Sequence, residues 1–178
     1  MARTATDDLL LGEWACLGAL YPRPAHGFAV AARLKPTGDI GRIWSLSRPL
    51  TYRALDQLVQ RGLLADQGQQ PGLAGGNRTI LKVSRLGRLT FRHWLNAPVV
   101  HLRDLRSELL LKLVLAEDCM VDISEMIDRQ RNHLVDMEAA LSTQLTTESV
   151  GVDRHDVVGL WRSEAAKSAI RFIDRLDR

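Results

Sequence analysis

A glycine-rich stretch at residues 68–77 is the feature that most restricts the fold of this chain. It holds four glycines and one proline in ten residues. Residues 63–67 before it are short and strand-like, and residues 78–83 after it alternate polar and apolar side chains, which is typical of a strand. Two short strands joined by a glycine-rich turn form a hairpin. The sequence therefore predicts a β-hairpin with a flexible turn at residues 68–77.

Two helices are expected near the start of the chain. Residues 10–20 carry apolar side chains at helical spacing, and Asp7 and Asp8 are placed to cap that helix. The prolines that follow stop it. Residues 27–34 form a second apolar-periodic segment that a proline and a glycine end, and residues 41–46 are expected to be extended.

A third helix is expected from residue 48 to about residue 61. Ser47 is a suitable N-cap, and Pro49 lies in the first turn, where its missing N–H costs least. Gly62 is placed as the C-cap. The side chains expected to face inward are apolar: Leu50, Ala54, Leu55, Leu58 and Val59.

A fourth helix completes the first half of the chain. Ser84 is its expected N-cap, and the helix runs to about Asn96, before Pro98. The order helix, helix, helix, strand, strand, helix is that of a winged helix-turn-helix with a two-stranded wing. The fold class is thus mainly α, with residues 1–98 as a winged-helix domain.

The second half, residues 99–178, is expected to be an all-α dimerisation domain. One helix is predicted over residues 102–116, and two more carry long apolar stripes. The first stripe consists of Ile123, Ile127, Gln130, Leu134, Met137, Leu141 and Leu145. The second consists of Val157, Leu160, Trp161, Ala165, Ser168, Phe172 and Leu176. Stripes this long need a partner to bury them, and the expected partner is a second copy of the chain.

The charge is distributed unequally between the two halves. Residues 1–98 hold thirteen Lys and Arg against six Asp and Glu, a net charge of +7. Residues 99–178 hold eleven against fifteen, a net charge of −4. A basic half suits a polyanionic partner.

The third helix is the predicted DNA-recognition helix, because such a helix reads bases in the major groove from its first turns. The polar side chains in those turns are Ser47, Arg48, Thr51, Tyr52 and Arg53. Asn77 and Arg78 at the rim of the wing are expected to reach the minor groove or its phosphates. The alternative for the wing is a hairpin tip without a ligand.

Several stretches of the chain match a known family. They are Leu9-Leu10-Leu11-Gly12, His26-Gly27-Phe28, Leu46-Ser47, Leu50-Thr51-Tyr52-Arg53-Ala54-Leu55, Leu58, Arg61-Gly62-Leu63-Leu64, Leu86-Gly87-Arg88 and the run from Arg103 to Leu113. Together they span nearly the whole chain, and they resemble the PadR family of bacterial transcriptional repressors.

The resemblance implies a winged-helix DNA-binding domain, a helical dimerisation domain and repression at inverted-repeat operators. It also implies that Ser47, Thr51, Tyr52 and Arg53 face DNA beside the wing. Two departures blur which side chains reach bases. Residues 49–53 lack the glycine that commonly precedes this run in the family, and residues 80–81 replace an aromatic pair. Tyr52 is alternatively half-buried against the wing.

A small aromatic effector is a further implication of the resemblance. Trp14 and Trp94 are candidates to line an effector cavity, and the alternative is that both are core aromatics. Cys16 and Cys119 lie in apolar patterns and are expected to be buried, reduced thiols.

Neither a catalytic motif nor metal-ligand spacing is found among the histidines and cysteines. No cofactor and no enzymatic activity are therefore expected. The apolar run near the start is too short to span a bilayer, so a cytoplasmic location is expected. The competing function is a winged-helix module that binds another protein instead of DNA.

Overall fold

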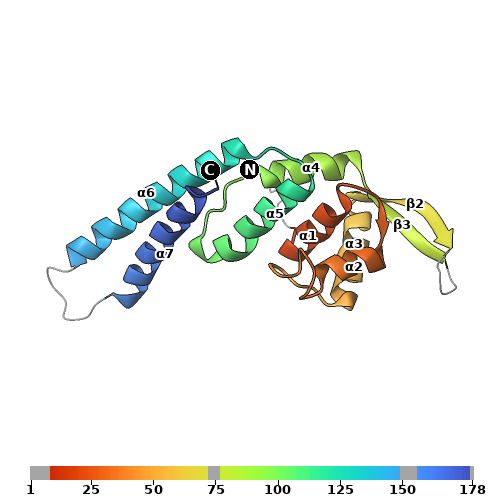
Figure 1. The fold of residues 1–178 in the computed structure, drawn as a ribbon, viewed down its shortest axis with the longest axis horizontal. Helices are drawn as coiled ribbons and strands as arrows, with labels where there is room; N and C mark the ends of the chain where they lie inside the picture. Colours follow the sequence, from red (N-terminus) through yellow and green to blue (C-terminus); the bar gives the residue numbers. More distant parts are fainter. Residues whose placement is uncertain (1–8, 72–76, 149–155, 177–178) are drawn as a thin grey trace. The chain divides into compact units, whose positions relative to one another are not determined.

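The fold was analysed in a computed structural model that describes residues 9–71, 77–148 and 156–176 (Figure 1). The chain divides into two compact units. The N-terminal unit holds the chain up to Leu95 together with residues 110–122, and the helical unit holds residues 96–109 and the chain from Ile123 onward. These contacts divide the chain differently from the single boundary predicted after residue 98. In the described ranges, no helix is long and apolar enough to cross a membrane.

Helix α1, Leu11–Leu20, opens the N-terminal unit and is buried along almost its whole length. Its N-cap is Leu10, whose backbone N–H donates to the carboxylate of Glu13 at 2.7 Å. The predicted caps, Asp7 and Asp8, lie outside the described residues. Glu13 in the first turn satisfies a donor that the helix itself leaves unpaired.

Helix α2, Gly27–Leu34, is confirmed as predicted. The extended segment predicted at residues 41–46 is wrong, because the chain forms turns there. The backbone N–H of Trp44 donates to the carbonyl of Ile40 at 3.2 Å, and that of Arg42 donates to Gly38 at 3.1 Å. These local bonds curl the segment.

Helix α3, Arg48–Gln60, begins and ends close to the predicted residues. Ser47 is its N-cap by backbone position, although its side chain makes no capping bond. Gly62 follows the helix with a φ of 69°, a conformation that favours glycine. The inward prediction holds for Ala54, Leu55 and Leu58, and it is wrong for Leu50 and Val59, which are exposed.

A three-stranded antiparallel sheet forms the wing. Its strands are β1 (Ala25–His26), β2 (Leu64–Pro71) and β3 (Asn77–Val83), in the spatial order β1-β3-β2. The hairpin of β2 and β3 confirms the predicted wing, and β1 adds a third strand. The strand predicted at residues 63–67 was too short, because β2 continues through Gly68 across a register shift.

Helix α4, Arg85–Leu95, is capped by the Ser84 hydroxyl, which accepts from the backbone N–H of Gly87 at 2.9 Å. The helix predicted over residues 102–116 is divided in the structure. A 3-10 turn (Leu102–Asp104) and a π-helical turn (Leu105–Leu109) belong to the helical unit, and α5 (Leu110–Asp118) belongs to the N-terminal unit. Helix α5 contacts α1.

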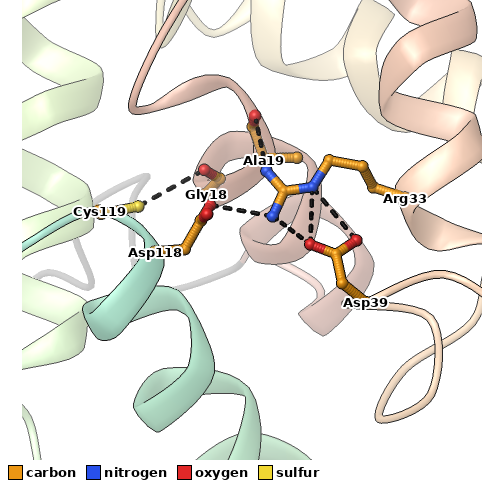
Figure 2. A network of polar contacts seen from close by, with 6 residues as sticks. All are labelled: Gly18, Ala19, Arg33, Asp39, Asp118 and Cys119. Carbon is orange, nitrogen blue, oxygen red and sulfur yellow. Dashed lines mark hydrogen bonds and ion pairs between the residues drawn. The ribbon is translucent and has the colours of Figure 1, made fainter.

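A polar network fastens the end of α5 to the winged helix (Figure 2). The guanidinium of Arg33 lies 2.5 Å from the carboxylate of Asp39 and 2.9 Å from that of Asp118. It also donates to the carbonyl of Ala19 at 3.3 Å. One side chain therefore ties together α2, the loop after it, the end of α1 and the end of α5.

Replacing Arg33 with alanine should cost about 1 kcal/mol of unfolding free energy at neutral pH, since the ion pairs are partly exposed. The hydrogen bond from Arg33 lowers the pKa of Asp39 below its usual value of 3.8. The pair therefore stabilises the folded state above pH 3.8, and this contribution is lost as pH falls through the lower folded-state pKa. Urea unfolding at neutral pH and well below pH 3.8 measures both effects.

Arg42→Ala is the matched control, because Arg42 lies exposed in the same loop region. It should leave the unfolding free energy within a few tenths of a kcal/mol of the unmodified chain. Equal stability of the Arg33 and Arg42 variants at neutral pH would contradict the role assigned to the network.

Both cysteines are buried, as predicted. Burial and, secondarily, the charge of Glu13 raise the pKa of Cys16 to about 12. Burial is also the main cause that raises the pKa of Cys119 to about 12. The Cys119 thiol donates to the carbonyl of Gly18 at 3.6 Å. Neither group has the lowered pKa that a reactive thiolate needs.

The helical unit pairs α6, Ser124–Glu148, with α7, Val157–Ile173 (Figure 1). Gln130 is fully buried on α6, and its amide bonds both backbone groups of Val99, at 2.6 and 3.0 Å. An ion pair of 2.6 Å joins Arg131 to Asp174. These contacts confirm helices where the two apolar stripes predicted them.

Helix α7 buries mainly small side chains within the unit. They are Gly159, Ser163, Ala166 and Ile173. Most of the stripe predicted for α7 is exposed instead, including Val157 (70%), Leu160 (52%) and Trp161 (62%). The stripe is therefore still without cover in the described single chain.

Candidate nucleic-acid interface

The outward face of α3 is set by which of its side chains are buried. Thr51, Ala54, Leu55 and Leu58 face the core. At 100° per residue, the opposite side carries Arg53 and Gln60, and both are exposed. Arg53 is therefore exposed on the side of α3 opposite the core, and its contact with DNA stays a prediction.

Thr51 does not belong to this face, and its assignment as a DNA contact is wrong. Its side chain is fully buried, and its hydroxyl donates to the carbonyl of Ser47 at 3.1 Å. Leu50, predicted to be buried, is 50% exposed. The buried arc of the helix is narrower than predicted, because Leu50 and Val59 at its two edges are exposed. Thr51 lies within the arc, and its burial costs little because its hydroxyl donates to a backbone carbonyl.

An aromatic and cationic cluster forms where α2 and α3 begin. The guanidinium carbon of Arg48 lies 5.2 Å from the ring centroid of Phe28 and 5.9 Å from that of Tyr52. Phe28 is 51% exposed. Cation–π contacts of this kind hold a guanidinium in one position while leaving its N–H groups free to donate.

Tyr52 is 39% exposed, and the packing partner found for its ring belongs to α2, so the alternative of a tyrosine half-buried against the wing stays a prediction. Its ring packs on Gly27 at the start of α2, where an added Cβ would lie 2.8 Å from the ring edge. The glycine therefore permits the close approach that positions Tyr52. The tyrosine lines a groove that the wing also lines, so both α2 and the wing border it.

The wing contributes Asn77 and Arg78 to the same groove. The amide of Asn77 donates to the side-chain carbonyl of Gln69 at 2.8 Å, across the hairpin. Nη1 of Arg78 lies 3.4 Å from Nε2 of His26. Both predicted wing residues therefore lie beside the recognition helix.

The groove measures about 790 Å³. Its walls are the start of α2, one side of α3 and the strands β2 and β3. Its charged lining residues are Arg48, Arg78, Asp56 and Asp66. The carboxylate of Asp66 accepts from the backbone N–H of Gly68 at 2.7 Å. Arg48 thus lies at the start of α3 and Arg78 on β3, whereas Asp56 lies further along α3 and Asp66 lies on β2.

Of the predicted site residues, four line this groove: Arg48, Tyr52, Asn77 and Arg78. Ser47 and Arg53 are exposed but do not line it, and Thr51 is buried. Sequence reasoning did not place Phe28 or His26 at this groove. His26 is the N-cap of α2, since its Nδ1 accepts from the backbone N–H of Ala29 at 3.0 Å. The pairing of β1 with β3, which brings His26 to the wing, left no signal in the sequence.

Trp14 and Trp94 lie elsewhere in the N-terminal unit. Their rings stack at 4.7 Å between centroids with 6° between planes, and both are more than nine-tenths buried. The ammonium of Lys112 lies 5.0 Å from the Trp94 centroid. The rings pack as core aromatics in this conformation, and their predicted role toward an effector stays a prediction.

In the described parts of the chain, no cluster of three or more His, Cys, Asp or Glu side chains is placed to hold a metal ion.

No family model matches the sequence, and no curated protein matches it either. Solved structures do match the fold. The chain is similar to Bacillus subtilis PadR in complex with operator DNA, at 14% identity and a TM-score of 0.47, over 92% of this chain and 96% of that one.

Two other matches have similar values. Bacillus subtilis PadR in complex with p-coumaric acid is 15% identical, with a TM-score of 0.45, over 94% of this chain and 96% of that one. A PadR-like transcriptional regulator from Bacillus cereus is 17% identical, with a TM-score of 0.41, over 97% of both chains. The function of this chain is therefore inferred from its own residues.

Proposed function

We propose that this chain is a homodimeric transcriptional repressor that binds an inverted-repeat operator in double-stranded DNA through its winged helix. The observation that carries the proposal is the position of Arg53. It is exposed on α3, and two further arginines, Arg48 at the start of the helix and Arg78 on the wing, line the groove beside α3.

The arrangement fits the chemistry of a DNA duplex. A helix in the major groove reads guanine with arginine, whose two N–H groups pair with O6 and N7. Cationic and hydrogen-bonding groups beside the helix bind phosphates and set its register. Arg53 is suited to the first role, and Arg48 and Arg78 are suited to the second.

Dimerisation is supported by the exposed stripe of α7. Val157, Trp161 and Phe172 lie within about 60° of one another around the helix axis, by 100° per residue. The residues that α7 buries in its own unit lie on the other side. An apolar helix face of this kind is typical of a surface that another protein covers, and we infer that a second copy covers it.

Footprinting on the promoter of the chain's own gene and its neighbours tests the proposal. Two protected half-sites about one helical turn, roughly 10 base pairs, apart are expected for a symmetric dimer. Affinity for the protected duplex should fall by about a thousandfold or more between dilute and moderate salt, because phosphate contacts release counterions. A single asymmetric half-site would argue against the dimer.

The competing function, a protein-binding winged helix, makes the opposite prediction for DNA. Such a module would not protect its promoter fragment even in dilute buffer. The acidic residues Asp56 and Asp66 in the groove are compatible with a basic protein partner. The salt titration on promoter DNA separates the two functions, because only the repressor shows a steep loss of affinity.

Release by a small aromatic effector remains part of the proposal. A ligand that entered between Trp14 and Trp94 would have to separate two rings now in van der Waals contact. Such a change should alter tryptophan fluorescence on titration with aromatic acids. A Trp94→Leu variant, which removes one of the stacked rings, is the matched comparison.

A further inference from the structure

We infer that His26 and Arg78 form a clamp for one phosphate of the DNA backbone, at the corner where α2 begins and the wing passes. The inference rests on the proposed function and adds a DNA-contacting residue, His26, from outside the recognition helix and the hairpin.

The hydrogen bond at Nδ1 decides where the His26 ring carries its proton. Nδ1 accepts from the backbone N–H of Ala29 at 3.0 Å, so its lone pair points at that donor. A neutral imidazole has one acceptor nitrogen and one donor nitrogen. Nε2 therefore carries the proton and is a donor toward the groove.

The neighbour of Nε2 is also a donor. Nη1 of Arg78 lies 3.4 Å away, and a guanidinium has no acceptor. The two groups cannot bond each other, so they need an oxygen acceptor that both can reach. Within the described ranges, no carboxylate of the chain lies within salt-bridge distance of Arg78.

The surroundings of the two donors favour an anion of high charge. The positive end of the α2 dipole lies at His26, its N-cap. Arg48 lines the same groove, stacked over Phe28. Asp56 and Asp66 also line it, and Asp66 is engaged by the backbone N–H of Gly68. A phosphate oxygen accepts from a histidine and an arginine at once, and charge-assisted bonds of this type are short and strong.

The position of His26 and Arg78 favours a DNA phosphate as the anion. The corner lies between the recognition helix, which would enter a major groove, and the wing, which would reach toward the next minor groove. The strand between those two grooves presents its phosphates to this corner. The pairing of β1 with β3, His26 opposite Ile80, keeps the two donors in register.

His26→Asn is the variant that tests the clamp. Asparagine is a good N-cap, so its side-chain oxygen keeps an acceptor for Ala29, but it lacks a donor at the position of Nε2. The variant should fold with an unchanged circular dichroism spectrum and bind the footprinted duplex about tenfold more weakly. His93→Asn, on the exposed surface of α4, is the matched control and should bind like the unmodified chain.

Neutral methylphosphonates, placed one at a time along the duplex, identify the phosphate. One position in each half-site should weaken binding of the unmodified chain by about tenfold. The same methylphosphonate should cause almost no additional loss of affinity in the His26→Asn variant. Arg78→Gln should behave in the same way, which keeps the test open if the histidine variant folds poorly.

Two results overturn the clamp and are distinct from failure of the proposed function. If the unmodified chain binds DNA and His26→Asn binds equally well, the clamp is wrong and the repressor stands. The clamp is also wrong if the fold-loss of affinity from His26→Asn multiplies with the fold-loss from every methylphosphonate position, because no phosphate is then coupled to His26. If the unmodified chain binds no duplex at all, the proposed function fails and the clamp fails with it.

Discussion

Arg53→Ala is expected to weaken operator binding by about 1–3 kcal/mol, because the variant loses a paired hydrogen bond to a guanine edge. Arg53 is exposed on the side of α3 opposite its buried residues, near the start of the helix. Its truncation leaves the core untouched, so the loss should be in binding and not in folding. Gel-shift titrations on the footprinted duplex, with thermal unfolding of the free protein, measure the two quantities separately.

Arg53→Lys separates base reading from simple charge. Lysine keeps the positive charge but lacks the planar fork that pairs with guanine. A phosphate contact would survive this change nearly intact, whereas a guanine contact would lose most of its discrimination. Unchanged affinity of the alanine variant would remove Arg53 from the DNA face and leave the proposed orientation of α3 without support.

Trp161→Glu is expected to convert the dimer to a monomer and to lower operator affinity by about a hundredfold or more, because two linked half-site contacts become one. Trp161 is 62% exposed in the single chain and lies in the apolar stripe of α7. A carboxylate placed there would be desolvated in the dimer, which is costly unless it is paired. Light scattering at micromolar concentration and gel shifts at matched salt give the two readouts.

Arg162→Glu is the control for the added negative charge. Arg162 is exposed on the same helix and lies at least 80° around the axis from Val157, Trp161 and Phe172, by 100° per residue. Its replacement should leave the mass in solution unchanged, with at most a small loss of affinity through long-range repulsion from DNA. A monomeric mass for the unmodified chain itself would contradict the dimer, whatever the variants do.

The order and ends of most helices and of the wing were predictable, because their signals are local. Ser84 caps α4, and Gly62 follows α3 with the expected left-handed backbone. A capping hydroxyl or a glycine acts within a few residues of its own position, so it can be found without knowing the fold. The same holds for the periodicity that placed α6 and α7.

The segments that failed are those where distant contacts compete with local preference. Residues 41–46 contain side chains that suit a strand, yet their backbone forms turns, and the side chain of Leu46 packs on Gly12 of α1. Helix α5 continues the chain from the helical unit but packs with α1, and Arg33 fastens it there through Asp118. Neither result follows from propensity, because each depends on a surface that a remote part of the chain supplies.

By itself, the sequence determined a winged helix, a basic first half, a helical second half and the outward position of Arg53. Only the tertiary structure decided that Thr51 is buried, that Tyr52 packs on Gly27 and that His26 meets Arg78. The reason is physical. Helical periodicity and capping act over a few residues, whereas His26 and Arg78 are 52 residues apart and become neighbours only when β1 pairs with β3.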